Sequence, residues 1–186
     1  VLLSFVCVST SAKEAITAYF YHSKPPLVID AQTKLGLYYD LTGYLNSHSH
    51  QFEFEAVFVP RKRIERMLNE GKLEGVLIGV NPVWFNDKNE QSYLWTNRIF
   101  TDRDEIVSLA NSPIEYISPQ SLIGKIFGGV RGFYYFGINE LVSTNKLQRI
   151  DTVKEVNLFY MLLNQRIDSA VISRSTFDYI MKKNDW

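Results

Sequence analysis

Hydrophobic and polar positions along the chain change repeatedly between two spacings. Apolar residues at every second position, or in short runs, predict strands, and apolar residues three or four positions apart predict helices. Strands are therefore expected at residues 16–21, 52–59, 75–79, 105–110, 126–130, 149–153 and 169–173, with a short extended piece at 27–30. Helices are expected at residues 37–46, 61–71, 136–145, 155–166 and 175–184. Strands that alternate with helices imply mainly parallel sheets with helices on both faces, so the predicted fold class is α/β.

The order of these elements indicates where a ligand would bind. In a doubly wound sheet the ligand lies at the carboxyl ends of the strands. The loops after Tyr21, Gly79, Val130 and Ser173 are therefore the expected binding loops. An irregular stretch at residues 81–103 separates the two runs of alternating elements.

The balance of charges limits the possible partners. Residues 13–101 and residues 102–186 each carry ten basic and ten acidic side chains. Without a basic stripe, the chain is not expected to bind nucleic acid or an anionic lipid surface. Aromatic residues make up 14% of the chain. Most should fill the core, and some Tyr and Trp side chains suit the wall of a ligand cleft.

The first twelve residues, VLLSFVCVSTSA, form an apolar run that ends in small residues. Thr10 and Ala12 stand at the −3 and −1 positions of a plausible signal-peptidase site. Residues 1–12 are therefore interpreted as a residual signal peptide, and the expected location is periplasmic. The alternative is a buried first strand. The run is too short to span a bilayer, and it contains the single cysteine, Cys7.

The segment GGVRGFYY at residues 128–135 is the sharpest local motif. It leaves a predicted strand and leads to the predicted helix at 136–145. Glycines at such a place let backbone amides approach a ligand, and a helix start favours an anion. The ligand-binding candidates here are Arg131, Gly132, Phe133 and Tyr134. The alternative is a tight turn in which the glycines serve only geometry, and the motif lacks the dinucleotide-binding spacing.

Further binding candidates come from the loops that follow other strands. Tyr21 ends the first predicted strand. Asn81 and Trp84 follow the strand at 75–79, where Trp84 either stacks on a flat ligand or caps the core. Lys88 is a candidate in the same loop, although a solvated turn would also explain it. Arg174 begins the last predicted helix, where the helix dipole disfavours a cation, so a ligand or an acidic side chain is expected to hold it.

The sequence carries no pattern that supports catalysis, a cofactor or a metal. It lacks a nucleophile elbow, a phosphate-binding loop and a Ser/His/Asp set. His48 and His50 have a spacing that a metal could use, but no third ligand accompanies them in this polar loop.

Several short motifs occur in an order that resembles the type II periplasmic binding proteins, specifically the family 3 solute-binding proteins of amino-acid ABC transporters. The Pro-Pro pair at 25–26 follows the first strand, and LGLYYDL at 35–41 is similar to the start of that family's first helix. The other matching segments are residues 64–79, YLWT at 93–96, SLIGK at 121–125 and QRIDSAVI at 165–172.

This resemblance implies a two-lobed domain arrangement. It assigns the first lobe to residues 13–101, the crossing between lobes to residues 102–105, and the second lobe to residues 106–186. It also implies a return of the chain to the first lobe, with a further strand and helix, beyond residue 186. We therefore expect the sequence to be part of a longer reading frame, and the first lobe to be incomplete without that return.

Two positions depart from the family pattern. Amino-acid binders in the family hold the ligand carboxylate with an arginine, at the position where this chain has Asn89 beside Lys88. They hold the ligand ammonium with an acid, at the position that we register as Arg174. An ammonium beside an arginine is unfavourable, so the ligand is not expected to be an ordinary α-amino acid bound in the usual way.

The resemblance implies an extracytoplasmic solute-binding protein that closes on a small polar ligand, performs no chemistry and passes the ligand to a membrane permease. One alternative is a periplasmic sensory or regulatory domain of a larger receptor or cell-wall enzyme, with a signalling domain fused to it. Another is a small dehydratase on the same scaffold, which would need convergent acid and base groups near the cleft.

Overall fold

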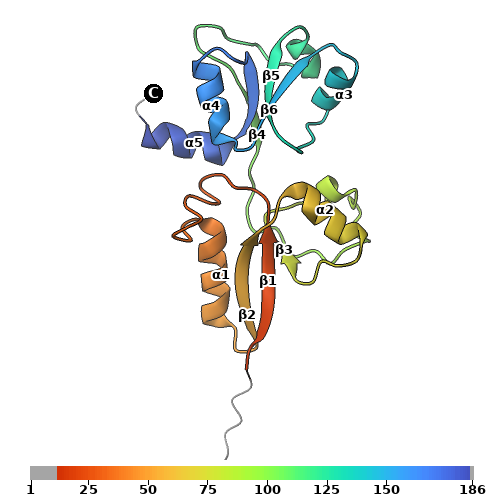
Figure 1. Ribbon diagram of the computed structural model, residues 1–186, viewed down its shortest axis with the longest axis vertical. Helices are drawn as coiled ribbons and strands as arrows, with labels where there is room; N and C mark the ends of the chain where they lie inside the picture. The colour runs from red at the N-terminus through yellow and green to blue at the C-terminus, as the bar shows by residue number, and fades with distance from the viewer. Residues whose placement is uncertain (1–11, 185–186) are drawn as a thin grey trace, which may run out of the picture.

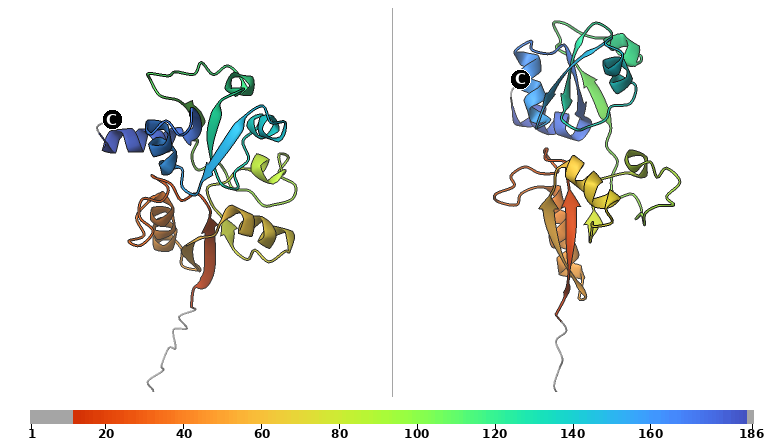
Figure 2. Two further views of the ribbon diagram at one scale, coloured as in Figure 1. Left: turned by 45° about the horizontal axis from the view of Figure 1, so that its top comes forward. Right: turned by 45° about the vertical axis from the view of Figure 1, so that its right-hand side comes forward.

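The computed structural model describes residues 12–184, which form two α/β lobes (Figure 1). The interpretation of residues 1–12 as a signal peptide, and Cys7 with it, concerns residues that lie outside the described part except for Ala12. Each lobe has its own sheet with helices on both faces, as predicted (Figure 1). The right-hand view in Figure 2 shows the two lobes joined through the segment that leads to the second sheet.

The first lobe is built on a three-stranded parallel sheet. Strand β1 (Glu14–Phe20) lies between β2 (Phe52–Phe58) and β3 (Val76–Leu77). Helices α1 (Leu37–His48) and α2 (Arg61–Asn69) cover opposite faces (Figure 1). Successive strand residues point to opposite faces, so β1 and the residue after it supply both cores. Phe20 packs in the cluster that includes Tyr38 of α1, and Tyr21 packs with Ile64 of α2.

The second lobe has a four-stranded sheet of order β4-β7-β5-β6. Its strands are β4 (Asp104–Val107), β5 (Ile126–Val130), β6 (Gln148–Thr152) and β7 (Ser169–Ser173). Strands β5, β6 and β7 run parallel, and β4 pairs with β7 in the antiparallel direction. Helices α4 (Val156–Leu163) and α5 (Arg174–Lys183) lie on one side, and α3 (Ile138–Ser143) lies on the other (Figure 1). The short helices η1 (Pro82–Phe85) and η2 (Pro119–Leu122) lie in the connections.

Burial along the strands follows their positions in the sheets. Every residue of β7 is buried, because this strand lies between two neighbours with both faces covered. Strand β2 lies at a sheet edge, and its two glutamates, Glu53 and Glu55, are exposed between half-buried apolar residues. The predicted strands at 126–130 and 169–173 are confirmed residue for residue.

Four local predictions are wrong. The strand predicted at 75–79 has only two residues, Val76–Leu77. Residues 27–30 do not form an extended piece: residues 25–27 form a turn, and Asp30 pairs with Leu35 in an isolated bridge. The helix predicted at 136–145 has only six residues, because Gly137 has a left-handed conformation with φ of 75° and the helix starts after it. The strand predicted at 105–110 ends at Val107.

The two lobes share one arrangement despite the absence of a sequence repeat. The order β2-β1-β3 in the first sheet matches the order β6-β5-β7 in the second. The residues that follow β1, β5 and β6 come together between the lobes. The carboxyl ends of the parallel strands in both lobes therefore face one another.

Candidate functional site

A cavity of about 170 Å³ lies between the two lobes at these strand ends. The first lobe contributes the residues that follow β1 and the last residue of β2. The second lobe contributes residues at or after the ends of β5 and β6. The lining residues are Tyr21, His22, Ser23, Lys24 and Phe58 from the first lobe, and Val130, Phe133, Val153, Lys154 and Glu155 from the second.

His22 is a buried polar group without a hydrogen-bond partner at one of its ring nitrogens. Its Nδ1 atom is enclosed and unpaired. The imidazole ring lies 4.1 Å from the Tyr21 ring, and 5.5 Å from the rings of Phe133 and Trp84, between centroids. Burial, with a smaller effect of the Lys24 and Arg61 charges, lowers the pKa of His22 to about 3. His22 is therefore neutral at pH 7, and it lines the cavity with an unpaired ring nitrogen.

A buried ion pair crosses from one lobe to the other beside the cavity. The Lys24 ammonium lies 2.8 Å from Oε2 of Glu155, and the two side chains are 11% and 7% exposed. The Glu155 Oε1 atom accepts a hydrogen bond from the Ser173 amide at 2.8 Å and lies 3.1 Å from the Ser173 hydroxyl. The Thr176 hydroxyl donates to the Pro25 carbonyl at 2.6 Å, which adds a second polar contact between the lobes.

Arg61, at the start of α2, holds the Tyr21 side of the cavity. It donates hydrogen bonds to the Tyr21 hydroxyl at 2.6 Å and to the Trp84 carbonyl at 2.7 Å. Its guanidinium also lies 2.9 Å from a Glu65 carboxylate oxygen and stacks 4.2 Å from the centre of the Phe85 ring. Burial raises the pKa of Tyr21 to about 12, so its hydroxyl stays protonated at neutral pH.

Asp87 organises the irregular stretch that follows η1. Its carboxylate accepts hydrogen bonds from the amides of Gln91, Ser92 and Tyr93 and from the indole nitrogen of Trp95. The Trp95 bond is the main reason that the pKa of Asp87 falls to about 2. This loop is therefore fixed around a buried carboxylate rather than being a solvated turn, which was the alternative considered for Lys88 and its neighbours.

The structure places two of the predicted site residues, Tyr21 and Phe133, in the cavity wall. Trp84 lies next to it against His22, and Asn81 caps η1 by accepting a bond from the Trp84 amide at 3.2 Å. The others do not line the cavity. Lys88 and Arg131 are exposed, and Gly132 is half-buried near Lys62. The remaining two have partners in their own lobe: Tyr134 donates to Glu140, and Arg174 pairs with Asp178 at 3.0 Å.

The glycines of the segment at 128–135 were expected to let backbone amides approach a ligand. Gly128 and Gly129 do not have this role, because protein side chains occupy the space beside them. A Cβ atom on Gly128 would lie 2.3 Å from Ile167, and one on Gly129 would lie 2.9 Å from Arg149. Both glycines therefore make room for neighbouring side chains. The amides of Val130, Arg131 and Phe133 all donate to oxygens of the second lobe. The six-residue α3 is too short to provide the expected anion site at a helix start.

Sequence reasoning missed His22, Lys24, Lys154 and Glu155. The rule that ligands bind after strand ends, which selected Tyr21, would also have selected Lys154 and Glu155, because they follow the predicted strand at 149–153. Arg61 was missed as well. It begins a helix, where the dipole disfavours a cation, and this was the argument that singled out Arg174. In the structure each arginine pairs with an acid on its own helix, Arg61 with Glu65 and Arg174 with Asp178, but Arg61 also donates to the buried Tyr21 hydroxyl.

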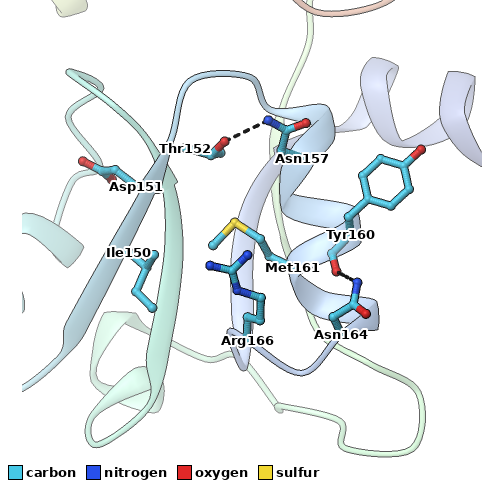
Figure 3. Close-up of a pocket in the computed structure, with 8 residues that line it drawn as sticks. All are labelled: Ile150, Asp151, Thr152, Asn157, Tyr160, Met161, Asn164 and Arg166. Atoms are coloured by element: carbon cyan, nitrogen blue, oxygen red, sulfur yellow. Dashed lines mark hydrogen bonds between the residues drawn. The ribbon is translucent and has the colours of Figure 1, made fainter.

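A second hollow, of about 340 Å³, lies within the second lobe between β6 and α4 (Figure 3). Its polar side chains bond locally: Asn157 donates to Thr152 at 3.1 Å, and Asn164 donates to the Tyr160 carbonyl at 2.7 Å (Figure 3). None of its lining residues comes from the first lobe. The inter-lobe cavity, with an unpaired buried nitrogen and an ion pair, is the better candidate site.

Within residues 12–184, no helix has the length and apolar character needed to cross a membrane. The same residues contain no group of three or more His, Cys, Asp or Glu side chains placed to hold a metal ion.

No family model matches the sequence, and no curated protein matches it. Solved structures do match its fold. The P235GK mutant of ArgBP from T. maritima aligns with a TM-score of 0.68 and 16% identity, over 92% of this chain and 73% of that one. The substrate binding protein of an amino acid ABC transporter aligns with a TM-score of 0.63 and 16% identity, over 90% and 74% of the two chains.

A third similar structure is the ancestral amino acid-binding protein AncCDT-1, described as a precursor of cyclohexadienyl dehydratase. It aligns with a TM-score of 0.64 and 15% identity, over 90% of this chain and 74% of that one. At these identities the similarity establishes the fold, and function needs a separate argument. Two lobes of matching strand order, a cavity between their strand ends and these alignments lead to one conclusion: this chain has the fold of the type II periplasmic binding proteins.

Proposed function

We propose that this protein is an extracytoplasmic solute-binding protein. It encloses a small polar ligand in the inter-lobe cavity, performs no chemistry on it and presents it to a membrane permease of the ABC type. The observation that carries the proposal is the cavity itself, because its wall comes from both lobes and its buried His22 nitrogen lacks a partner. A ligand held by both lobes would couple binding to closure.

The contacts in the cavity favour binding over catalysis. A dehydratase would need an acid and a base free to act on the substrate. His22, Lys24 and Glu155 do lie around one cavity, which brings together groups that the sequence did not connect. However, both oxygens of Glu155 are engaged, one by Lys24 and the other by Ser173. The carboxylate is therefore a fixed part of the wall.

The first experiment is a thermal-shift screen of the full-length protein against amino acids, small carboxylates, sugars and peptidoglycan fragments. A ligand at 100 times its dissociation constant stabilises the folded state by about 2.7 kcal/mol. We expect a hit that disappears in Ser23→Trp, because Ser23 lines the cavity and a large side chain would fill it. The matched control is Ser112→Trp, at an exposed loop position in the second lobe.

Two outcomes would count against the proposal. A compound that stabilises the wild type and Ser23→Trp equally would bind outside the cavity. If no compound in the screen shifts the melting temperature, the alternative of a sensory or regulatory domain, whose partner is another protein, would be favoured. Fractionation of cells that express the native reading frame tests the proposed periplasmic location, and recovery of the protein in the cytoplasm would contradict it.

A further inference from the structure

Glu155 presents a carboxylate at the inter-lobe cavity from the second lobe. Its side chain is 7% exposed, and Ser173 fixes Oε1 through its amide. A buried carboxylate is costly unless a cation or several donors compensate it. Because Ser173 occupies Oε1, a cation that compensates this carboxylate has to approach Oε2. The other oxygen, Oε2, therefore decides what kind of ligand this cavity can accept.

The first lobe supplies the cation at that position. Lys24 follows β1 by four residues, and its ammonium lies 2.8 Å from Oε2 of Glu155. The loop that carries Lys24 is held to the second lobe by the bond from Thr176 to the Pro25 carbonyl. The ammonium is thus brought to the carboxylate by the chain itself, and it occupies the space that a ligand cation would need.

The remaining charges around the cavity give the ligand a preferred sign. Two lysines, Lys24 and Lys154, and one carboxylate line the wall, which leaves one net positive charge. Neutral His22 adds a polar nitrogen without a partner. An imidazole nitrogen that carries its proton donates to an anion. Asp104, on the neighbouring β4, does not line the cavity but is near enough for the Lys24 and Glu155 charges to affect it. Burial raises the pKa of Asp104, which favours its uncharged form.

We infer that Lys24 is the specificity-determining residue of the cavity: as a tethered ammonium beside Glu155, it excludes ligand cations and selects a small monocarboxylate. This inference rests on the proposed function for its ligand, but the role of Lys24 can be tested separately. It agrees with the expectation from the sequence that the ligand is not an ordinary α-amino acid bound in the usual way.

The test is chemical rescue of Lys24→Ala by n-propylammonium, which replaces the atoms that the substitution removes. We expect Lys24→Ala to melt at a lower temperature than the wild type, and propylammonium to raise its melting temperature saturably by about 2–4 °C or more. The wild type, and the double variant Lys24→Ala/Glu155→Gln, should not respond. Sodium and tetramethylammonium chlorides at equal ionic strength control for salt effects.

Rescue that is absent, or equally strong in the double variant, would overturn the assignment of Lys24. If Lys24→Ala does not fold, Glu155→Gln provides the second test. It keeps the size of the side chain and releases the Lys24 ammonium, so we expect propionate to bind at least about tenfold more tightly than to the wild type. Unchanged or weaker propionate binding would contradict the inference.

Measuring which small molecules bind to the wild type distinguishes a failure of this inference from a failure of the proposed function. We expect propionate to bind at least about tenfold more tightly than its neutral isostere propionamide, and alkylamines not to bind. The control is Lys154→Ala, which should weaken propionate binding without creating propylammonium binding. Tight binding of ordinary α-amino acids by the wild type would overturn the inference and leave the proposed function standing. If no small molecule binds, the proposed function fails, while the rescue experiment still tests Lys24.

Discussion

The ring of Phe133, from the second lobe, meets the ring of Tyr21, from the first lobe, at 89° with 5.9 Å between centroids. Phe133 also contacts the hydrophobic clusters of its own lobe. A single aromatic side chain thus joins the cores of both lobes at the cavity wall. Together with the Lys24–Glu155 pair, it holds the lobes in contact.

The first prediction concerns this aromatic contact. Phe133→Ala should lower the free energy of unfolding by about 1–3 kcal/mol, since Phe133 is half-buried and a fully buried phenylalanine contributes at the top of that range. It should also increase the radius of gyration measured by X-ray scattering, because the lobes lose an apolar contact. The control is Phe136→Ala in the same segment, where the ring is 87% exposed and little change is expected. Equal effects of the two substitutions would contradict the bridging role.

The second prediction concerns Arg61. Arg61→Met keeps the apolar stem and removes the bonds to the Tyr21 hydroxyl and the Trp84 carbonyl. We expect a loss of about 2–3 kcal/mol in denaturant unfolding, because hydrogen bonds to charged groups are among the stronger ones. Amide exchange in η1 should also become faster. Arg63→Met, at an exposed position of the same helix, is the control. Unchanged exchange in η1 would show that Arg61 does not anchor this segment.

The third prediction is a pH dependence caused by His22. Its pKa is about 3 in the folded protein and about 6.5 when unfolded, so only the unfolded state takes up this proton between these values. The stabilisation is complete above pH 6.5 and is lost as the pH falls toward 3, with a slope of up to about 1.4 kcal/mol per pH unit. His22→Gln should reduce the slope of the unfolding free energy in this range. His50→Gln, at an exposed position, should leave it unchanged, and a wild-type slope in His22→Gln would exclude His22 as its source.

The fourth prediction concerns the loop held by Asp87. Asp87→Ala removes the acceptor for three backbone amides and the Trp95 indole, so hydrogen exchange at residues 91–95 should become faster. The second lobe should keep its protection pattern, because none of these bonds reaches it. Glu90→Gln is the control in the same loop, at an exposed side chain. Protection at 91–95 that survives Asp87→Ala would mean that other contacts order the loop.

The fifth prediction compares two glycines. Gly128→Ala would place a methyl group 2.3 Å from Ile167 and 2.9 Å from Leu158, and such overpacking costs about 1–3 kcal/mol. Gly43→Ala adds the same methyl group in α1, where no atom lies within 4 Å, and should stabilise the protein by about 0.5–1 kcal/mol. Denaturant unfolding of both variants gives the comparison. A Gly128→Ala variant as stable as the wild type would show that this glycine does not serve packing.

The sequence by itself determined the α/β class, most of the elements and the ends of the strands where the cavity lies. These features depend on local periodicity: β7 has an apolar centre at residues 170–172, as expected of a strand covered on both faces, and β2 alternates because its acidic residues face solvent. Tyr21 and Phe133 were selected because they lie at or just after the ends of predicted strands. That position can be read from the sequence without knowing which residues of the other lobe face it.

Only the tertiary structure decided which polar groups meet. Lys24 and Glu155 are 131 positions apart, and their pairing depends on how two lobes face each other. Arg61 and Arg174 both begin helices and both pair with an acid one turn along, yet only Arg61 also bonds to the buried Tyr21 at the cavity. Periodicity identifies the face on which a side chain lies, whereas the partner of a charge across a cleft is set by contacts between distant segments. For that reason the elements could be predicted locally, and the chemistry of the cavity could not.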